Sequence, residues 1–417
     1  MTVELSQVEK QILEGSQGEA AQLAMQIIVR MAEIAGASRL IEISQAHIDA
    51  CTMLTHSGLR FIEMLAEKGA RVIVPTTTNP LPLDPVNYPH QGLTDDYIAM
   101  AKRSYQAYLS LGAKPTWTCA PYQEIDPPKV GEQVAWGESN AIVYVNSVFG
   151  ARTERYPDYM DVCAALTGRV PGSGLHLTQN RRGQVLFNVS GIDPKVLASD
   201  TFFVALGFLV GKLTEDKIPV ITGVPAATSD QLKNLGAAAA SSGSVGLFHL
   251  VGITPEAETL ELAFQGGQPE KQFLISQKEI DHALLELNQT AEETGSLDVV
   301  AFGCPHFSLQ EFDRFNTLLA ALPDRAKFAT RVFIEISPGF YQKLKTECAL
   351  TRFLQAGGEF LVGSCLFHTP ILTTSGLKIM TNSGKFAYYS PGELNAHIAF
   401  GSLEACFRSA VEGKVTR

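Results

Sequence analysis

The sequence predicts an α/β fold with parallel sheets, and two observations support this prediction. Helical and strand patterns alternate over roughly the first hundred residues and again after Gly295, as they do in βαβ units. The chain has 417 residues, of which 45% are hydrophobic and 18% charged, so it is long enough for two or three packed units. We therefore expect a multi-unit α/β protein whose chemistry lies where strands end.

The individual elements follow from periodicity and from helix caps. In the first part we expect a helix over 18–35, a strand over 39–44, a helix over 59–69, a strand over 70–77, a helix over 93–112 with Gly112 as its C-cap, and a strand end over 115–122. Later we expect a small-residue helix end that turns into a buried strand over 235–252, a strand over 299–302, a capped helix from Ser308, a strand over 331–337, a helix over 338–349 and a strand over 359–365. Breaks near 191–193 and 264–270 divide the chain into regions 1–190, 191–270 and 271–417.

Composition excludes several classes of protein. The formal net charge of -10 argues against a nucleic-acid surface, and no basic run exceeds Arg181–Arg182. The N-terminus is charged, no stretch of about twenty apolar residues could span a bilayer, and we expect a cytoplasmic protein with no membrane partner. The seven cysteines include no CxxC pair, which disfavours a disulfide framework and a ribbon-type zinc site.

Three cysteines share one sequence context. Cys119 in TWTCAPY, Cys304 in VAFGCPHFS and Cys365 in FLVGSCLFHTP each end an apolar run. Three thiolates at strand ends could converge on one iron-sulfur cluster and leave one iron without a protein ligand. Buried cysteines are more often simple packing residues, so spacing alone leaves both interpretations open. The other cysteines lie inside helical or strand patterns and are expected in the core.

The densest polar stretch, over 135–171, is a candidate substrate site. Carboxylate, amide, hydroxyl and guanidinium side chains crowd around its glycines: Glu138, Ser139, Asn140, Asn146, Ser147, Arg152, Thr153 and Arg155. Guanidinium groups suit two-pronged capture of a substrate carboxylate, so a small carboxylate substrate is expected. The alternative is a solvated loop with incidental charge.

Two further segments could contact a ligand. Thr381, Asn382, Ser383 and Gly384 resemble an anion-binding turn of backbone amides, and Lys385 adds positive charge. The segment lacks the spacing of a nucleotide P-loop, so ATP binding is not expected. Asn79 in TTTNP could also reach a ligand, although a turn before proline is an equally good explanation.

Several motifs in fixed order resemble one known family. TTTNP, TWTCAPY, VAWGESNAIVYVNSVFGARTERYPDYMDVCAALTGR, GLHLTQNRRG, GCPHFS, GSC and TNSGKFAYY together resemble the large subunit of aconitase X over nearly the whole chain. The resemblance implies an aconitase-type body of about three α/β/α subdomains with parallel or mixed sheets around a central cleft. It also implies an iron-sulfur cluster on Cys119, Cys304 and Cys365, and a small swivelling domain, fused or supplied as a separate subunit, that the 417 residues lack.

The resemblance further implies a hydro-lyase mechanism. The open iron would act as a Lewis acid on the leaving hydroxyl while a base removes the proton α to a carboxylate. Arg152 or the turn from Thr381 to Lys385 would hold the substrate carboxylate. The base is expected on the small domain. Should the chain act alone, Ser57, Glu138 and Ser383 are the first candidates, and His56 beside Ser57 is a candidate substrate contact.

Two substrates are consistent with the resemblance. These are cis-3-hydroxy-L-proline, dehydrated to Δ1-pyrroline-2-carboxylate, and mevalonate 5-phosphate, dehydrated to an anhydromevalonate phosphate. The segment GARTERYPDYMDVCAALTGR resembles the hydroxyproline group and favours the first. Gly363, where relatives often carry aspartate, and the atypical THSG over 55–58 are departures from the pattern. A non-enzymatic homologue that binds a cluster or a partner as a sensor is the third alternative.

Overall fold

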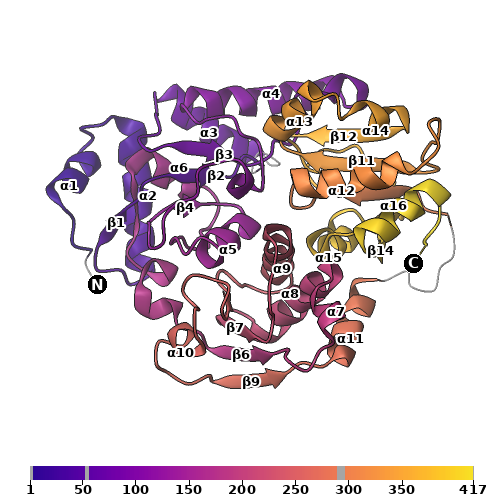
Figure 1. Cartoon of the computed structure of the whole chain (residues 1–417). Coiled ribbons are helices and arrows are strands. Elements are labelled where there is room, and N and C mark those ends of the chain that lie inside the picture. The colour runs from indigo at the N-terminus through magenta and orange to yellow at the C-terminus, as the bar shows by residue number, and fades with distance from the viewer. Residues whose placement is uncertain (1–2, 52–55, 289–295, 417) are drawn as a thin grey trace.

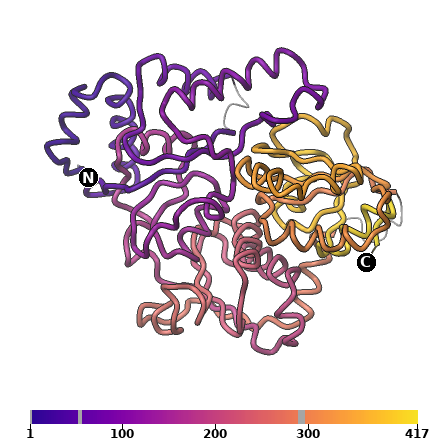
Figure 2. The backbone as a smooth tube through the Cα atoms, turned by 45° about the horizontal axis from the view of Figure 1, so that its top comes forward, coloured from indigo at the N-terminus to yellow at the C-terminus, as the bar shows by residue number. Residues whose placement is uncertain are grey.

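The computed structural model describes residues 3–51, 56–288 and 296–416. These residues form three lobes, which we call the N-terminal lobe (3–181), the middle lobe (182–288) and the C-terminal lobe (296–416) (Figure 1). A view from another side shows the same three groupings, with the two ends of the chain on opposite sides (Figure 2). None of the helices in the described ranges is long and apolar enough to cross a membrane.

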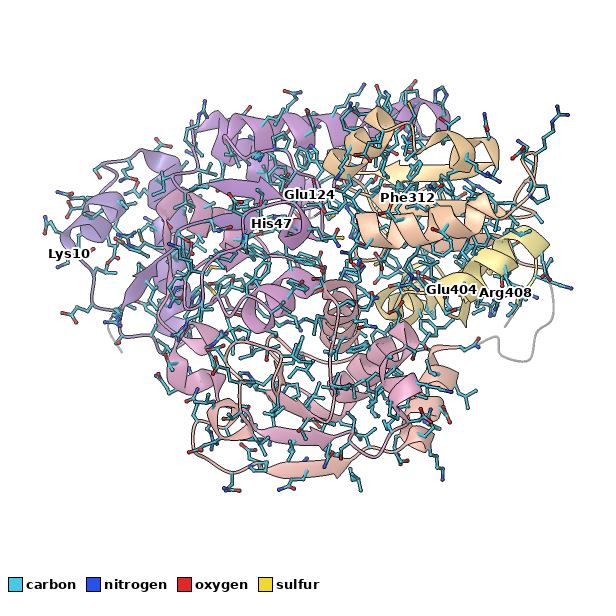
Figure 3. The ribbon with its side chains drawn as sticks, in the orientation of Figure 1. Lys10, His47, Glu124, Phe312, Glu404 and Arg408 are labelled. Atoms are coloured by element: carbon cyan, nitrogen blue, oxygen red, sulfur yellow. The ribbon has the colours of Figure 1, made fainter. Side chains whose placement is uncertain are left out.

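The N-terminal lobe contains a parallel sheet of three strands in the order β3-β2-β4 and an antiparallel pair, β1-β5. Its elements are α1 (Gln7–Leu13), α2 (Glu19–Ile34), β1 (Leu40–Glu42), β2 (Ala46–Ile48), α3 (His56–Glu67), β3 (Thr76–Thr78), η2 (Tyr88–His90), α4 (Asp95–Ser110), η3 (Pro121–Gln123), β4 (Ala135–Trp136), α5 (Ser139–Ser147), α6 (Met160–Thr167), β5 (Arg169–Pro171), η4 (Gly174–His176) and η5 (Thr178–Arg181). Lys10 lies at the outer edge of this lobe, whereas Glu124 lies close to the C-terminal lobe (Figure 3).

The middle lobe is built on a parallel sheet in the order β8-β7-β6-β9. Its elements are β6 (Val185–Asn188), α7 (Pro194–Leu197), α8 (Asp200–Thr214), β7 (Pro219–Thr222), α9 (Ser229–Ser242), β8 (His249–Leu250), α10 (Leu260–Ala263), β9 (Lys271–Leu274) and α11 (Gln277–Leu287). Because β6 precedes residue 191 and β9 follows residue 270, the expected region boundaries would cut through this sheet. A sheet is built from strands that are distant in sequence, and local composition does not reveal which strands pair.

Helices α8 and α9 pack closely in the middle lobe because both carry small residues. A Cβ atom on Gly207 would lie 2.3 Å from the Leu235 carbonyl oxygen, and one on Gly211 would lie 2.6 Å from that of Ala239. The small-residue patch of the sequence therefore serves helix packing, as expected, and ends in the buried strand β8.

The C-terminal lobe contains a parallel sheet in the order β12-β11-β10-β13-β14. Its elements are β10 (Val299–Phe302), α12 (Leu309–Ala320), β11 (Arg331–Ile336), α13 (Pro338–Thr346), α14 (Thr351–Gln355), β12 (Gly358–Val362), β13 (Lys378–Thr381), α15 (Gly384–Glu393), β14 (His397–Phe400) and α16 (Leu403–Glu412). The fold is thus an α/β arrangement in which each lobe has its own parallel sheet. Ser308 caps α12 through a capping box with Glu311, as the sequence predicts.

Two expected strands differ from the structure. The strand predicted over 70–77 is only β3, because the Val72 N–H bonds to the Leu111 carbonyl and the Ile73 N–H to the Ala165 carbonyl instead of to a sheet. The segment 115–122 forms no strand, and a single bridge between Thr77 and Lys114 precedes it. Apolar composition predicted burial at both places, but it did not predict the partner of each backbone amide.

Candidate active site

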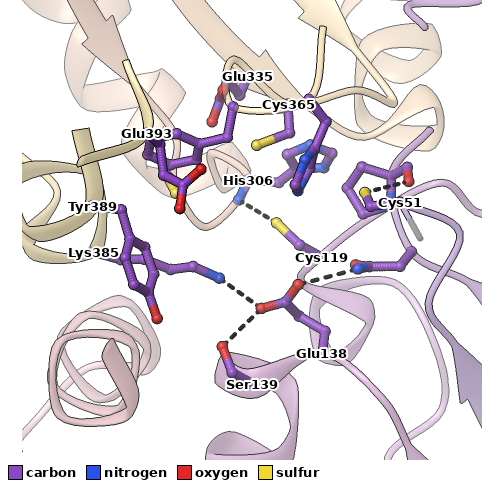
Figure 4. A pocket seen from close by; sticks show the side chains of 15 residues that line it. Cys51, Cys119, Glu138, Ser139, His306, Glu335, Cys365, Lys385, Tyr389 and Glu393 are labelled. Carbon is purple, nitrogen blue, oxygen red and sulfur yellow. Dashed lines mark hydrogen bonds and ion pairs between the residues drawn. The ribbon is translucent and has the colours of Figure 1, made fainter. Parts of the chain in front are cut away.

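A cavity of about 420 Å³ lies between the N-terminal and C-terminal lobes (Figure 4). Thiol, carboxylate, imidazole and ammonium groups share its wall with apolar side chains. The residues that line it are Cys51, Asn79, Pro80, Cys119, Glu138, Ser139, Cys304, His306, Glu335, Cys365, Phe367, His368, Lys385, Tyr389 and Glu393.

These residues meet because parallel strands present their carboxyl ends to one place. In the N-terminal lobe, Asn79 directly follows β3 and Glu138 lies just beyond β4. In the C-terminal lobe, Cys304 follows β10 and Cys365 follows β12. Two sheets therefore aim their carboxyl ends at the same cavity, which is where open α/β sheets bind ligands.

Cys119 is held by the turn that carries Cys304. The backbone N–H of His306 donates a hydrogen bond of 3.2 Å to the Cys119 sulfur. The His306 ring is fixed in turn, because its Nε2 donates to the Ser364 carbonyl at 3.0 Å and its Nδ1 lies 3.2 Å from the Thr118 hydroxyl. Burial lowers the pKa of His306 to about 4, so the ring is neutral at pH 7 and acts here as a structural link between cysteine-bearing segments.

Cys304 sits in a turn that is tied to α15. The Cys304–Pro305 peptide bond is cis. The Ser383 hydroxyl donates a hydrogen bond to the Cys304 carbonyl and accepts one of 3.0 Å from the Phe386 N–H. Ser383 is therefore the N-cap of α15 and a support for the Cys304 turn, which is a positioning role rather than a contact with ligand.

Cys365 lies in a loop that is anchored by Glu335. The Glu335 carboxyl accepts a hydrogen bond of 2.6 Å from the Leu366 N–H. Burial raises the pKa of Glu335 to about 8, despite that hydrogen bond and the positive charge of Lys385. Burial also raises the pKa of the Cys365 thiol well above its usual value, and the Phe367 N–H partly opposes this effect. The loop thus offers a thiol together with a backbone donor that favours its thiolate form.

The three expected cysteine ligands therefore converge on one cavity. Burial raises the pKa of Cys119 to about 12 and that of Cys304 well above its usual value, so both are thiols until a metal displaces the proton. In the part of the chain that the structure describes, no three His, Cys, Asp or Glu side chains approach closely enough to hold a single metal ion. Iron-sulfur clusters are held by cysteine thiolates, so the chemistry of the donor set fits such a cluster.

Glu138 and Lys385 form a largely buried ion pair across the cavity, with 2.6 Å between Nζ and Oε1. Ser139 Oγ donates to the same carboxylate at 3.0 Å and Asn79 Nδ2 donates at 3.1 Å. Burial alone would raise the pKa of Glu138, but Lys385 and the amide groups of Asn79 and Asn140 outweigh it and hold the pKa well below its usual range. The carboxylate is therefore a poor proton acceptor, which counts against Glu138 as the base.

Behind this pair lies a second layer of carboxyl groups. Asn79 Nδ2 also donates to Asp49 at 3.1 Å, and the Asp49 N–H donates to Asp161 at 2.6 Å. Burial raises the pKa of Asp49 to about 6 and that of Asp161 to about 7. These groups fix the side chain of Asn79, and through it they fix Glu138.

Most of the polar stretch over 135–171 lies away from the cavity. Asn146 Nδ2 donates to the Thr153 carbonyl at 3.0 Å, and the Thr153 hydroxyl accepts from the Trp136 N–H at 3.1 Å. Ser147 Oγ accepts from the Phe248 N–H at 2.9 Å and so joins the N-terminal lobe to the middle lobe. The expectation of substrate contacts at Asn146, Ser147 and Thr153 finds no support in this arrangement, because their polar atoms hold the backbone together.

Arg152 also lies outside the cavity lining. Its Nη1 donates to the His176 carbonyl at 3.2 Å, and burial lowers its pKa, with the nearby charge of Arg181 acting in the same direction. A clamp on a substrate in the thiol cavity would need a guanidinium that faces it. The cationic side chain that lines the cavity is Lys385.

The remaining expected contacts are not among the residues that line the cavity. Thr381 Oγ1 accepts from the Ser383 N–H at 3.1 Å, and Gly384 packs against Val204 of α8. Asn382 Oδ1 is buried without a hydrogen-bond partner among the described residues. His56 and Ser57 begin α3 on an exposed face, and residues 52–55, which include the start of the THSG motif, lie outside the described residues.

Several lining residues were not assigned a role from the sequence. Cys51 was expected in the core, yet it follows β2 by three residues and lines the cavity, with its thiol 2.9 Å from the Pro80 carbonyl oxygen. Tyr389 and Glu393 follow Lys385 at intervals of four residues, a spacing that puts all three on one face of a helix. That spacing was visible in the sequence and could have revealed them. No spacing or motif in the sequence predicted that Glu335 would line the cavity.

Family models for aconitase X match the chain almost from end to end. The aconitase X first domain matches residues 2–179, the second domain 183–284 and the third domain 297–412. The crystal structure of aconitase X from Thermococcus kodakaraensis in its holo-form is similar, with a TM-score of 0.87 and 28% sequence identity over 98% of this chain and 100% of that one.

Characterised relatives fall into two groups. A cis-3-hydroxy-L-proline dehydratase of Pseudomonas aeruginosa is 40% identical over 98% of this chain and 70% of its own length. A phosphomevalonate dehydratase large subunit of Methanosarcina mazei is 32% identical over 98% of this chain and 98% of its own length. With three matched domains, this fold and these relatives, the chain belongs to the aconitase X family of dehydratases.

Proposed function

We propose that the chain is the large subunit of an iron-sulfur hydro-lyase that converts cis-3-hydroxy-L-proline to Δ1-pyrroline-2-carboxylate. The observation that carries the proposal is the meeting of three thiols and one largely buried ammonium group in a single cavity. Higher identity to the hydroxyproline dehydratase of Pseudomonas aeruginosa, 40% against 32% for the phosphomevalonate enzyme, supports the choice of substrate.

Cys119, Cys304 and Cys365 would hold the cluster in this proposal. When bound, an open iron supplies Lewis-acid chemistry to the leaving hydroxyl group. The chain supports the thiolates through backbone N–H groups, one at Cys119 and one at Cys365. Such donors favour the charged form of sulfur and tune the bound group.

Lys385 would bind the substrate carboxylate, a role that the sequence also suggested for Arg152. An ammonium group has three N–H donors, and in the described residues Glu138 takes one of them. The others are available to a ligand in the cavity. Glu138, held ionised by its donors, keeps Lys385 charged and aimed, so Glu138 acts as a positioning residue for the ammonium group.

The base that removes the α proton would come from a small swivelling domain, on a separate subunit or another segment. The name of the Methanosarcina relative, a large subunit, supports the existence of such a partner. Two lining residues are poor candidates for the base, because Lys385 and its other donors hold the pKa of Glu138 low and His306 is bonded at both nitrogens.

The phosphomevalonate reaction is the second candidate, because the Methanosarcina enzyme matches this chain over 98% of both lengths. To decide, the chain would be produced without oxygen together with its small partner and assayed on both substrates, following loss of one water by mass spectrometry. We expect kcat/KM for cis-3-hydroxy-L-proline to exceed that for mevalonate 5-phosphate by at least about 100-fold. The reverse preference would refute the proposal, and turnover of neither substrate would favour a cluster-binding sensor.

A further inference from the structure

We propose that Glu393, together with Tyr389, binds the ring ammonium group of the substrate and thereby selects an amino acid over a phosphorylated hydroxy acid. The inference rests on the proposed function and deepens it, because it assigns the selectivity to residues of this chain. It concerns the face of α15 that lines the cavity.

The three residues of that face run from the interior of the cavity to its rim. Lys385, Tyr389 and Glu393 are spaced by four residues, so they lie one above another along α15. Figure 4 shows all three side chains on the same side of the cavity, with the Lys385 ammonium group directed toward Glu138. A small ligand held by Lys385 would therefore lie beside Tyr389 and Glu393.

The charges of the cavity favour a ligand that carries a positive group. Among the described residues the lining contains no arginine, and its one lysine, Lys385, is already paired with Glu138. Glu393 forms no ion pair within the described residues. It is also the last residue of α15, and the carboxyl end of a helix carries partial negative charge that attracts cations.

Tyr389 supplies a fixed aromatic wall between the two charges. Its ring lies 5.5 Å from that of Tyr388 and 6.2 Å from that of Phe367, the latter at 90°. Such neighbours restrict the rotation of the ring. A saturated five-membered ring can pack against this wall, and an ammonium group near its face gains cation–π attraction.

The two substrates of the family present opposite charges to these residues. Hydroxyproline carries a carboxylate and an ammonium group on one carbon, which match Lys385 and Glu393. Mevalonate 5-phosphate carries a carboxylate and a phosphate and has no cation. Its phosphate would meet the carboxylate of Glu393 without a free arginine or lysine among the lining residues.

The test uses two ligands that differ only at the ring atom. L-Proline carries the ring ammonium group, and tetrahydrofuran-2-carboxylate has oxygen in its place. Binding of both would be measured by calorimetry to the wild-type complex, to Glu393→Gln and to a control, Glu261→Gln, which lies on α10 outside the cavity. We expect wild type and the control to prefer L-proline by about tenfold or more, and Glu393→Gln to reduce that preference to about twofold.

Turnover separates this inference from the proposed function. In Glu393→Gln we expect KM for cis-3-hydroxy-L-proline to rise about tenfold with kcat changed less than about threefold. The reason is that the variant loses a contact that binds the substrate and keeps the groups that act in the reaction. Tyr389→Leu should weaken both calorimetric ligands, and L-proline more than tetrahydrofuran-2-carboxylate, because only the ammonium group loses cation–π attraction. If wild type dehydrates hydroxyproline while Glu393→Gln keeps its preference for L-proline, this inference is wrong and the proposed function stands. If wild type dehydrates only mevalonate 5-phosphate, both are wrong.

Discussion

The surroundings of its sulfur set Cys119, a proposed iron ligand, apart from the packing cysteines of this chain. Cys119 accepts a backbone N–H at its sulfur and lines the cavity, whereas Cys163 and Cys406 are fully buried among apolar side chains. Cys51 shares the cavity but has its thiol against a carbonyl oxygen, which favours the protonated form. A buried thiol that faces a carbonyl is a poor thiolate donor.

The proposed function assigns the iron to Cys119, Cys304 and Cys365. Replacing Cys119, Cys304 or Cys365 by alanine should remove the visible absorbance and most of the bound iron, because two thiolates hold a cluster poorly. The measurement is the absorbance spectrum and iron content after anaerobic purification of the complex.

The matched controls are alanine variants of the remaining buried cysteines. Cys51→Ala, Cys163→Ala and Cys406→Ala should keep both colour and iron. Cys51→Ala is the most informative, since it changes a thiol in the same cavity. Loss of colour there, or colour retained in Cys304→Ala, would contradict the ligand assignment.

The sequence predicted only part of this site, for reasons that particular residues make clear. Cys304 and Cys365 end apolar runs in one sheet, so their meeting follows from strand order and was predictable in outline. Arg152 was attractive because of its chemistry, but the fold turns it toward the His176 carbonyl. Glu335 could not have been found, because its role depends on a loop that begins almost thirty residues later and folds back onto it.

At the scale of elements, the junction between β10 and the Cys304 turn depends on close backbone approach. Gly303 has a φ of +100°, and a Cβ atom there would lie 2.4 Å from the Glu335 carbonyl oxygen. Gly357 has a similar φ of +92°, but a Cβ atom there would meet nothing within 4 Å. Comparing alanine substitutions at the two glycines therefore separates the energetic cost of a positive φ from that of a steric clash.

We predict that Gly303→Ala lowers the free energy of unfolding more than Gly357→Ala does. Positive φ alone costs alanine about 1–3 kcal/mol, and Gly303→Ala must also displace a backbone carbonyl, which adds at least about 1 kcal/mol. Denaturant unfolding of both variants and the wild type measures the difference. Equal losses of unfolding free energy would mean that the backbone of β11 at Glu335 shifts to accept the methyl group at little cost.

Local signals predicted helices better than strands for a physical reason. The capping box of Ser308 and Glu311 spans only four residues, and it correctly predicts the start of α12. The segment from Arg71 to Pro75 has strand-like composition, but its amides bond to the end of α4 and to α6. A strand needs a partner that is distant in sequence, and a helix does not.

At the scale of the whole molecule, a buried charge cluster joins the middle and C-terminal lobes. Lys233 of α9 forms ion pairs with Glu311 of α12 and, at 3.1 Å, with Asp230. Ser308 Oγ donates to Asp230 at 2.8 Å, and the Ser308 N–H donates to Glu311 at 2.9 Å. Burial raises the pKa of Glu311, while Lys233 opposes that rise. The cluster fixes α9, which also packs against α15, so it helps to hold the wall that carries Lys385.

The last prediction concerns this cluster. Lys233→Met leaves Glu311 buried without its cation, and we expect a loss of about 3–5 kcal/mol in the free energy of unfolding. The double variant Lys233→Met, Glu311→Gln removes both charges and should be more stable than Lys233→Met alone. Denaturant unfolding of the wild type, both single variants and the double variant completes the cycle. If the two single losses simply add in the double variant, the groups do not interact, and the contact between α9 and α12 depends on apolar packing alone.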